Sequence, residues 1–344
     1  MFRTTAAAII VALSTPVSAL PAFSDIYVFG DSLSDTGNVA ALLGNNRYIR
    51  NEVGYGTNGR FSNGAVWHEY LADSFGMARA SAVRKNGGND YSHGGARTDF
   101  AIGPRQGILL QGAEYGITSG LRSDPDALYI AWTGGNDVQS LADEADAELV
   151  LDARLDNFET MLKAFAASGA TSLLVPNLPD IGQIPKFSDR DTKDRASALT
   201  VQWNDGLAEL SFDIASTYGI DVFQLDVFSI FNDILADPLS NGFINTTDEC
   251  RSLTALGLIE LECRDADRFV FWDDVHPTTA AHRLIAERAF DLIAGSSLFA
   301  SAFAKASMIG RLDTEDVPSP AVPALLGLGV IALAAYRRRR SAIA

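Results

Sequence analysis

The sequence predicts an α/β fold in which helices cover both faces of a mainly parallel sheet. Short apolar runs bounded by glycine or proline, such as residues 26–29 and 128–132, are typical of buried strands. Longer segments with apolar residues at helical spacing lie between these runs. Strands that alternate with helices in this way form parallel sheets. With 344 residues, the chain is long enough for one large domain of this kind or two small ones.

Five strands and four helical segments are expected in order along the chain. The predicted strands are residues 26–29, 128–132, 172–175, 220–225 and 269–272. The predicted helical segments are residues 67–75, 141–167 (one helix or two), 195–218 and 278–293. Polar motifs follow the first, second and fifth of these strands. Because sites in parallel sheets form beyond the carboxyl ends of the strands, we expect the functional residues at that edge.

Acidic residues outnumber basic ones by 43 to 27, which gives the chain a formal net charge of −16. Such a charge repels nucleic acid and anionic membrane surfaces. We therefore expect no nucleic acid among the partners of the protein, and no general lipid-clamping role.

Residues 1–19 have the layout of a secretory signal peptide. Arg3 precedes the apolar run 6–13, and residues 17–19 supply a small-residue cleavage site. A buried first helix is the alternative, but the apolar run is short and polar residues interrupt it. We expect export through the inner membrane, with the mature protein in the periplasm, at the cell surface or outside the cell. Residues 20–312 then form the folded domain.

Residues 313–344 form a second terminal segment. A linker leads to the uncharged apolar span 321–336, and the arginine cluster 337–340 follows. The span is short for a bilayer, which requires about 20 residues. The segment resembles the PEP-CTERM sorting signals of Gram-negative bacteria in their Val-Pro-x-Pro-Ala form, here residues 317–321, although the glutamate of the commonest form is absent. This resemblance implies sorting or processing machinery as a partner; a permanent C-terminal anchor is the alternative.

Cys250 and Cys263 are the only cysteines of the chain. They close a short loop in a protein that is expected to leave the reducing cytosol, so we predict a disulfide between them. Such a bridge would contribute about 3 kcal/mol in the chain-entropy model. Two thiols without a neighbouring histidine make a poor zinc site.

The motif 29–38 directly follows the first predicted strand. Gly30 permits a tight turn there, so Ser32 presents its hydroxyl above the sheet, and its own backbone N–H points toward the same space. A serine in this place is either a candidate nucleophile or the N-cap of a helix.

A serine hydroxyl needs a neighbouring base to act as a nucleophile. The chain has four histidines, which are His68, His93, His276 and His282. His276 follows Asp273 by three residues, a spacing at which the carboxylate reaches the imidazole Nδ1 and leaves Nε2 free for Ser32. Asp274 is the rival partner, but its adjacent position makes that hydrogen bond harder to close.

Acyl transfer also needs donors for the oxyanion that develops on the substrate, each worth about 3 to 4 kcal/mol. Gly94 and Gly95 allow the backbone to approach a substrate closely, and Asn136 supplies a side-chain amide. The sequence Gly-Gly-Asn-Asp occurs twice, at residues 87–90 and 134–137. Only the second copy follows a good strand, which favours Asn136.

At these motifs the chain resembles the GDSL lipases and esterases of the SGNH hydrolase superfamily, from about Ile26 to Ala294. The blocks that carry the resemblance occur in the family's order, at residues 29–38, 59–64, 90–96, 134–137 and 273–278. In the third block Asp90 replaces the usual asparagine and Ser92 the usual alanine, whereas Gly95 is intact.

The resemblance implies a flavodoxin-like three-layer α/β/α sandwich, no metal and no cofactor. It also implies Ser32 as the nucleophile, His276 as the base and Asp273 as the residue that orients the base. The oxyanion hole would consist of the backbone N–H groups of Ser32 and Gly95 and the side-chain amide of Asn136.

We therefore expect an exported esterase or lipase that forms an acyl-enzyme on carboxylic esters, including lipids. Because the base must be neutral, activity should fall in acid. The same residues would serve a polysaccharide O-acetylesterase, an acyltransferase or a phospholipase. From a different class, a surface-binding protein without catalysis is the alternative. The connections 38–63 and 235–268 are expected to wall the substrate pocket. Its candidate aromatic lining is Tyr48, Tyr55, Phe61 and Trp67.

Overall fold

The computed structural model describes residues 21–253 and 260–312 of the chain. Leu20–Gly295 forms one compact unit, whereas the described residues from 296 onward belong to a second unit, in which they continue the last helix. The expected signal peptide and the C-terminal segment lie outside the described residues. Among the residues that are described, no helix is both long and apolar enough to cross a membrane.

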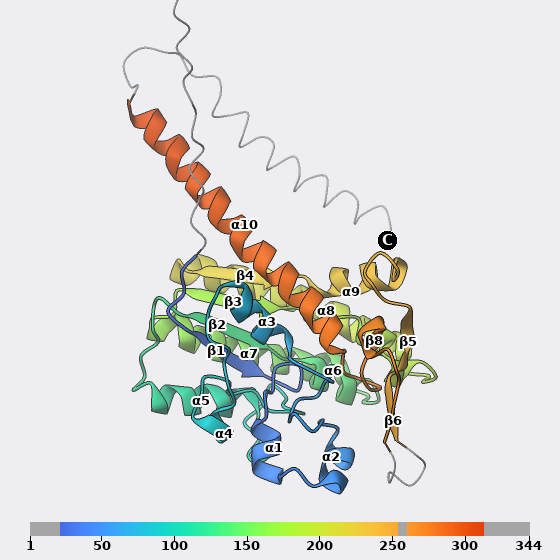
Figure 1. The fold of residues 1–344 in the computed structure, drawn as a ribbon. Helices are drawn as coiled ribbons and strands as arrows, with labels where there is room; N and C mark the ends of the chain where they lie inside the picture. The colour runs from blue at the N-terminus through green and yellow to red at the C-terminus, as the bar shows by residue number, and fades with distance from the viewer. Residues whose placement is uncertain (1–20, 254–259, 313–344) are drawn as a thin grey trace, which may run out of the picture. The chain divides into compact units, whose positions relative to one another are not determined.

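A four-stranded parallel sheet forms the centre of the larger unit, with its strands in the order β1-β2-β3-β4 (Figure 1). These strands are β1 (Ile26–Gly30), β2 (Leu128–Trp132), β3 (Ser172–Pro176) and β4 (Asp221–Leu225). The first four predicted strands and the parallel α/β fold are therefore confirmed. Beyond β1, residues 89–93 run alongside it, and the Tyr91 N–H donates to the Val28 carbonyl at 2.8 Å.

The predicted fifth strand exists, but it does not join this sheet, so that part of the prediction is wrong. β8 (Phe269–Phe271) pairs in parallel with β5 (Asn245–Glu249) in a separate two-stranded sheet. The sequence did not reveal the partner strand of β8, because β5 has the polar sequence Asn-Thr-Thr-Asp-Glu, which gives no apolar signal for a strand.

An antiparallel hairpin of β6 (Arg251–Leu253) and β7 (Glu260–Glu262) follows β5. Cys250, directly before β6, and Cys263, directly after β7, form a disulfide. The Cys263 N–H also donates to the Cys250 carbonyl at 2.8 Å. The base of the hairpin is thus closed by a covalent bond and a hydrogen bond.

The predicted helices at 67–75, 195–218 and 278–293 are present, the last as the first part of a helix that continues to Leu312. The segment 141–167 contains one helix, Ala147–Ser168, and Leu141 at its start is the last residue of the preceding helix. The α-helices of the described residues are α1 (Asn38–Leu43), α2 (Arg47–Val53), α3 (Trp67–Ser74), α4 (Val83–Asn86), α5 (Ile108–Thr118), α6 (Gly135–Leu141), α7 (Ala147–Ser168), α8 (Lys193–Tyr218), α9 (Val227–Ala236) and α10 (Thr279–Leu312). Short 3-10 turns lie at Ile181–Gln183, Pro185–Phe187 and Ala266–Arg268.

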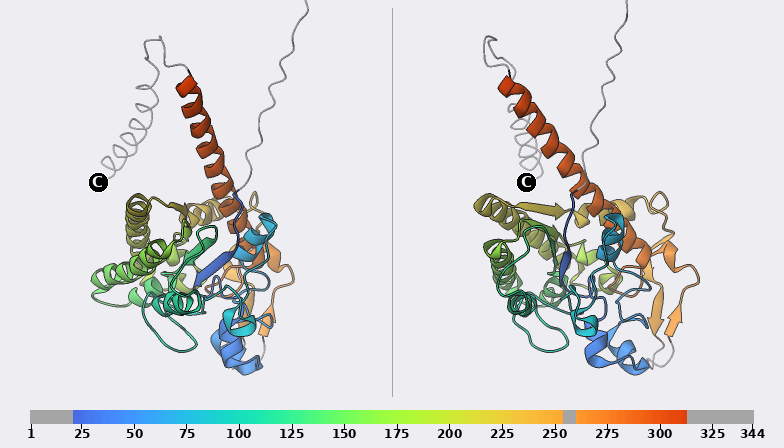
Figure 2. Two further views of the ribbon diagram at one scale, coloured as in Figure 1. Left: turned by 90° about the vertical axis from the view of Figure 1, so that its left-hand side faces the viewer. Right: turned by 60° about the vertical axis from the view of Figure 1, so that its left-hand side comes forward.

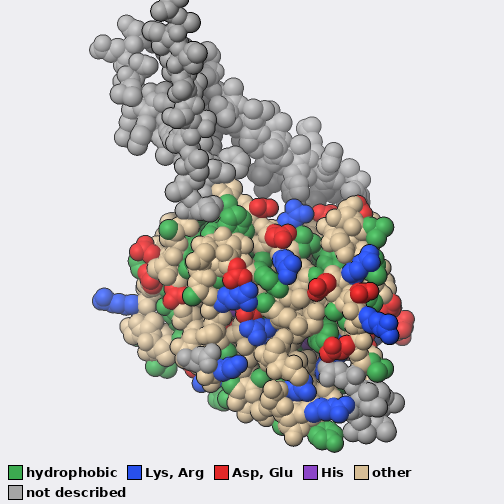
Figure 3. Space-filling view, in the orientation of Figure 1, with side chains coloured by type: hydrophobic (Ala, Val, Ile, Leu, Met, Phe, Trp, Pro, Cys, Tyr) green, Lys and Arg blue, Asp and Glu red, His purple; other side chains and the backbone are tan. Residues whose placement is uncertain are grey.

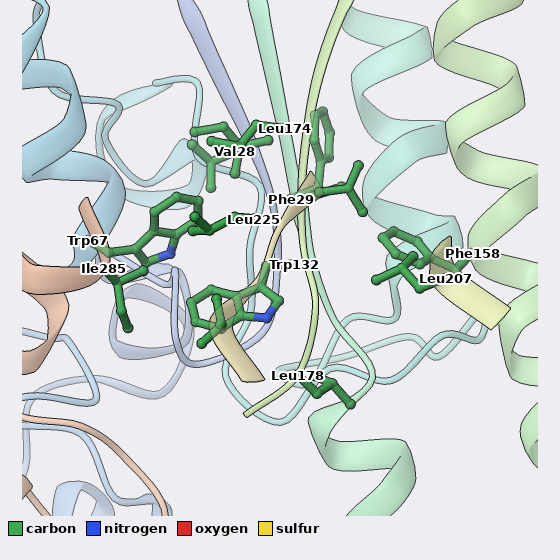
Figure 4. Close-up of a cluster of buried hydrophobic side chains, with 14 of the residues drawn as sticks. Val28, Phe29, Trp67, Trp132, Phe158, Leu174, Leu178, Leu207, Leu225 and Ile285 are labelled. Carbon is green, nitrogen blue, oxygen red and sulfur yellow. The ribbon is translucent and has the colours of Figure 1, made fainter. Parts of the chain in front are cut away.

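Helices cover both faces of the sheet, which gives three layers (Figures 1 and 2). On one face, the ring centroid of Phe29 in β1 lies 4.6 Å from that of Phe165 in α7. On the other face, the ring centroid of Trp67 in α3 lies 5.4 Å from that of Trp132 in β2. Figure 4 shows side chains of both groups with the strands between them. Because successive side chains of a strand point to opposite faces, burial of both faces explains the continuous apolar runs.

Candidate active site

Ser32 lies in a tight turn that follows β1. The turn starts from Gly30, which has a φ of 154° and pairs with Trp132 of β2; a Cβ at Gly30 would collide with the Trp132 carbonyl oxygen. Gln111 of α5 holds the Gly30 residue at both ends, since its Oε1 accepts from the Gly30 N–H at 2.9 Å and its Nε2 donates to the Gly30 carbonyl at 2.8 Å. The chain therefore leaves the sheet at a fixed point two residues before Ser32.

A buried carboxylate, Asp35, fastens the serine turn to the loop that carries Gly95. Asp35 accepts hydrogen bonds from the backbone N–H of Asn38 at 2.6 Å and from that of Gly94 at 2.9 Å. The Asn38 side chain in turn donates to the Ser92 carbonyl at 2.8 Å. Two segments that are more than 50 residues apart are thus held together by the side chains of the opening motif.

The two residues that depart from the family's usual pattern contact each other. The Asp90 carboxylate accepts from the Ser92 hydroxyl, and it also accepts from the Thr36 N–H at 2.8 Å. Burial raises the pKa of Asp90 to about 6, although these hydrogen bonds act in the opposite direction. The loop before Gly95 is thus fixed to the serine turn although Asp90 and Ser92 replace the residues usual at these positions.

His276 bridges Ser32 and Asp273. Its Nε2 lies 2.7 Å from the Ser32 Oγ, and its Nδ1 lies 2.8 Å from Oδ2 and 2.9 Å from Oδ1 of Asp273. The Asp273 Oδ1 also accepts from the backbone N–H groups of Val275 at 2.9 Å and His276 at 2.7 Å. These two hydrogen bonds fix the orientation of the Asp273 carboxylate independently of its contact with the imidazole. Of the two neighbouring aspartates, Asp273 rather than Asp274 contacts His276 through its carboxylate.

The loop that carries His276 is fastened by the block 59–64 and the residues after it. The Ser62 hydroxyl donates to the Pro277 carbonyl at 3.0 Å, and the Asn63 Oδ1 accepts from the Thr279 N–H at 2.8 Å. The Thr279 hydroxyl donates to the Ala65 carbonyl, again at 2.8 Å. The histidine is therefore positioned although β8 lies outside the central sheet.

The surroundings of His276 favour its charged form. Burial opposes the imidazolium, but the charge of Asp273 and its hydrogen bond, with smaller contributions from Asp31 and Asp274, raise the pKa of His276 above 6.5. Burial acts to raise the pKa of Asp273, but the imidazole and the two backbone donors outweigh it, so this pKa is lowered. Asp273 therefore stays ionised near neutral pH, and His276 is a stronger base than an ordinary histidine.

The expected oxyanion donors line one cavity together with His276. The backbone N–H groups of Ser32 and Gly95 have no acceptor among the described residues. Asn136, near the start of α6, donates through Nδ2 to the Ala96 carbonyl at 3.0 Å and more weakly to Asp31 at 3.4 Å. The Asn136 amide is thereby oriented, and the two backbone donors remain available to a ligand.

This cavity has a volume of about 530 Å³, and most of the residues that line it are polar or charged. As expected, both long connections contribute to it, residues 51–54 and Phe61 from the first and Glu249 with residues 251–253 from the second. The ring of Phe61 lies 5.2 Å from the imidazole of His276, measured between centroids. The substrate-sized space in front of Ser32 is thus walled largely by elements outside the central sheet, among them α2, α6, β5 and β6.

The other aromatic candidates do not line the cavity. Tyr55 is buried behind Phe61, with their ring centroids 5.9 Å apart. Trp67 belongs to the core, where its Nε1 donates to the Ser34 hydroxyl at 3.2 Å. Tyr48 is 68% exposed. Of the four predicted lining residues, Phe61 alone has that position.

A second and smaller cavity of about 70 Å³ also adjoins Ser32. It shares Ser32 and Asn136 with the larger cavity. Its apolar lining includes Leu33, Leu178, Ile181, Val227, Ile230 and Ile234. Ser32 therefore lies between a polar space and an apolar one, which suits a substrate with one part of each kind.

The remaining histidines are buried and have other partners or none. The His68 Nε2 lies 2.9 Å from the Ser34 carbonyl, and the His93 Nδ1 lies 2.8 Å from the Tyr91 carbonyl. The imidazole of His282 has no hydrogen-bond partner in the described part of the chain, and burial lowers its pKa to about 3. Within residues 21–253 and 260–312, no group of three or more His, Cys, Asp or Glu side chains is arranged to hold a metal ion.

Sequence reasoning missed two residues that position the site, Gln111 and Asp35. Asp35 lies inside the opening motif, where a buried carboxylate three residues after Ser32 could have been read as an acceptor for nearby backbone N–H groups. Gln111 lies 81 residues from its partner Gly30, and no local pattern distinguishes it from other helical glutamines.

Comparison with known proteins gives relatives for most of the chain. It is 29% identical over 318 residues to the phosphatidylcholine-sterol acyltransferase of Aeromonas hydrophila, covering 79% of this chain and 91% of that protein. It is 28% identical over 284 residues to the thermolabile hemolysin of Vibrio parahaemolyticus, covering 76% and 62%. It is 26% identical over 340 residues to Lipase 1 of Photorhabdus luminescens, covering 79% of this chain and only 50% of the lipase.

Among solved structures, a member of the lipolytic protein G-D-S-L family from Veillonella parvula has a TM-score of 0.43 and 15% sequence identity, covering 78% of this chain and 96% of that one. Residues 26–289 match the family model described as GDSL-like lipase/acylhydrolase. This match spans β1, the serine turn and the His276 loop, and it extends into α10. The chain therefore belongs to the GDSL-like lipase/acylhydrolase family.

Proposed function

We propose that the protein is an exported serine ester hydrolase in which Ser32 forms an acyl-enzyme. The observation that carries this proposal is the continuous path of hydrogen bonds from the Ser32 Oγ through His276 to Asp273. A hydroxyl 2.7 Å from an imidazole whose pKa is raised by Asp273 is suited to lose its proton as it attacks a carbonyl carbon.

In the first half of the reaction, the Ser32 Oγ bonds to the ester carbonyl carbon while its proton passes to the His276 Nε2. The negative charge that develops on the carbonyl oxygen is stabilised by the N–H groups of Ser32 and Gly95 and by the Asn136 amide, which gives up its weak 3.4 Å contact with Asp31 for the oxyanion. When the intermediate collapses, the bond to the alcohol oxygen breaks and His276 returns the proton to the departing alcohol.

In the second half, a water molecule gives a proton to His276 and attacks the acyl-enzyme. The bond to the Ser32 Oγ breaks, the Oγ takes the proton back, and the carboxylic acid leaves. If an alcohol enters in place of water, the same steps transfer the acyl group. The polar cavity of about 530 Å³ has room for such an acceptor, so acyl transfer is the second candidate activity.

The two cavities beside Ser32 support an assignment of the two halves of the substrate. The acyl chain of the ester lies in the apolar cavity, and the alcohol part lies in the polar one. An acetyl group would contact little of the apolar wall, so esters of longer acids fit this site better than the acetyl esters of a polysaccharide.

The disulfide between Cys250 and Cys263 supports export, because such bonds persist in oxidising compartments. Cleavage after residue 19 and recognition of the segment 313–344 by sorting machinery are parts of the same proposal. Amino-terminal sequencing of the protein from its native host should find Leu20 as the first residue. A mature protein that retains residues 1–19 would contradict the export proposal.

The Ser32→Ala variant of the full-length chain tests the function directly. Hydrolysis of p-nitrophenyl acetate, butyrate and octanoate should fall by about 10³-fold or more, because the nucleophile is missing. In the parent, kcat/KM should rise roughly fourfold for each methylene from acetate to butyrate, as apolar surface is buried. Ser74→Ala, on the exposed side of α3, is the matched control and should retain parental rates. Turnover by Ser32→Ala at the parental rate would refute the assignment.

The pH dependence of kcat/KM tests the role of His276. The base works when neutral, so activity should be lost as the pH falls through its pKa, which lies above 6.5 because of Asp273. Asp273→Asn removes the charge that raises this pKa. The midpoint of the acid limb should therefore move to lower pH, while the rate at pH 8 falls by about 10³- to 10⁴-fold. An unchanged midpoint in Asp273→Asn, or a flat parental profile from pH 5 to 8, would be incompatible with this role.

A further inference from the structure

An apolar tip, residues 100–104, lies in the connection between Gly95 and α5. It has the sequence Phe-Ala-Ile-Gly-Pro, without a polar side chain. Phe100 is 54% exposed and Ile102 is 84% exposed. On the face shown in Figure 3, hydrophobic side chains lie scattered among charged and polar groups, which is the ordinary pattern of a protein surface. Two large exposed apolar side chains only two residues apart on one loop depart from that pattern.

The loop that carries the tip is held together at its base. The Gly107 N–H donates to the Ala101 carbonyl at 3.0 Å, and the Leu109 N–H donates to the Asp99 carbonyl at 3.2 Å. A Cβ at Gly107 would collide with the Asp99 carbonyl oxygen, so the two arms of the loop are in close contact. Gly103 has a φ of 120°, which lets the chain reverse between them. The exposure of the tip is therefore a property of an ordered loop.

The charged residues next to the tip lie outside it. Asp99 accepts from a backbone N–H of the tip at 3.0 Å, and its Oδ2 lies 3.3 Å from the Arg154 guanidinium of α7, which the buried Asp137 shares. Arg97 and Arg105 precede and follow the tip in sequence. Removal of residues 100–104 from water therefore buries apolar groups without burying a charge.

The tip lies close to the mouth of the polar cavity. Arg97 is three residues before Phe100, Arg105 is three residues after Ile102, and both arginines line that cavity. Because three residues of extended chain span at most about 11 Å, each apolar side chain starts within that distance of the cavity wall. The stem of Arg105 also packs on the oxyanion donor Gly95, where a Cβ would lie 2.9 Å from the Arg105 Cδ. A surface that covered the tip would thus lie beside the entrance to the active site.

Two other segments of the cavity wall also have exposed apolar groups. The exposed Tyr48 of α2 precedes the lining residues Asn51 and Glu52 by three and four positions, so the three share one face of the helix. Leu253 of β6 lines the cavity and is 38% exposed. A tyrosine, with an apolar ring and a polar hydroxyl, suits the boundary between an apolar phase and water. Apolar groups from three separate segments therefore border the mouth.

We propose that the apolar tip inserts into the surface of a lipid bilayer and holds the mouth of the cavity against it. The net charge of −16 repels anionic bilayers, so the surface is one of zwitterionic lipids. Aromatic and aliphatic side chains that enter the headgroup region attach a protein without spanning the membrane.

This inference rests on the proposed function, in which an acyl chain enters the apolar cavity beside Ser32. If the mouth lies against the bilayer, that chain passes from lipid to protein with little exposure to water, which removes the cost of hydrating it. The partner assigned here is the lipid surface itself, and residues 100–104 are the part of the protein that contacts it.

The fluorescence of a tryptophan placed in the tip tests this contact in the full-length chain. Phe100→Trp is made in a Ser32→Ala background, so that no lipid is hydrolysed, and is mixed with phosphatidylcholine vesicles. The emission of the added tryptophan is obtained by subtracting that of Ser32→Ala alone. It should shift to the blue, and it should be lost when the acyl chains of the lipid are brominated. Phe212→Trp, at an exposed phenylalanine of α8 outside the cavity lining, is the matched control and should show neither change.

The contact should also affect turnover by the chain that retains Ser32. The measured quantity is the rate on p-nitrophenyl laurate held in phosphatidylcholine vesicles, divided by kcat/KM for p-nitrophenyl butyrate in water. In Phe100→Ser/Ile102→Ser this ratio should fall about tenfold or more, because burial of each large apolar side chain is worth about tenfold in partition. Hydrolysis of the soluble butyrate should stay at the parental rate. Ile117→Ser/Phe212→Ser, an exposed aliphatic and aromatic pair outside the cavity lining, should keep both values.

Three results would overturn the proposal. The first is equal quenching of the added tryptophan at both positions, or quenching at neither. The second is an unchanged ratio in Phe100→Ser/Ile102→Ser. The third is a parent that sediments as a dimer without vesicles and a tip variant that sediments as a monomer, because the tip would then be covered by a second copy of the chain.

Failure of this inference is distinguishable from failure of the proposed function. If the parent hydrolyses soluble p-nitrophenyl butyrate but bromination leaves the emission of the tip tryptophan unchanged, the lipid contact is refuted and the hydrolase stands. If the parent hydrolyses no ester, the fluorescence measurement still decides the inference, because it does not depend on turnover.

Discussion

The site depends on one contact between distant parts of the chain, the 2.7 Å hydrogen bond between Ser32 and His276, which are 244 residues apart. The two residues are not on the same sheet, since Ser32 follows β1 and His276 follows β8. Their separation is therefore set by two independent sets of contacts. Gln111 and the close approach of Gly30 to β2 fix the serine, whereas Ser62 and Asn63 fix the histidine loop.

Within the opening motif, most side chains serve to hold the loops rather than to act on a substrate. Burial raises the pKa of Asp35 to about 6, with the neighbouring Asp90 as the next cause, and backbone N–H donors from Gly94 and Gly37 counteract this. Keeping such carboxylates inside the protein is unfavourable unless donors surround them. One of these donors, the Gly94 N–H, belongs to the residue directly before Gly95. The hydrogen bonds that make burial of the Asp35 charge tolerable therefore also fix the loop that carries the oxyanion donor Gly95.

Much of the architecture follows from local signals. Strands β1, β2 and β3 are largely apolar on both faces, so their positions are visible in the sequence. His276 with Asp273 is marked by a three-residue spacing. The strand pair of β5 and β8 could not be predicted as such, because β5 is polar and gains its order from its partner.

The aromatic candidates illustrate the same limit from the other direction. Tyr55, Phe61 and Trp67 are close in sequence and equally apolar, yet one lines the cavity, one supports it from behind and one belongs to the core. Sequence position identifies the connection that walls the site. Only the path of that connection over His276 decides which ring faces the substrate.

The most direct test of the account is to ask which residue of the folded, full-length chain reacts with diethyl p-nitrophenyl phosphate. The Oγ of an activated serine attacks the phosphorus atom and releases p-nitrophenolate, and peptide mass spectrometry then locates the adduct. The account predicts one p-nitrophenolate per chain, an adduct on Ser32, and parallel loss of ester hydrolysis. An adduct on another serine, or full hydrolytic activity after complete labelling of Ser32, would contradict it.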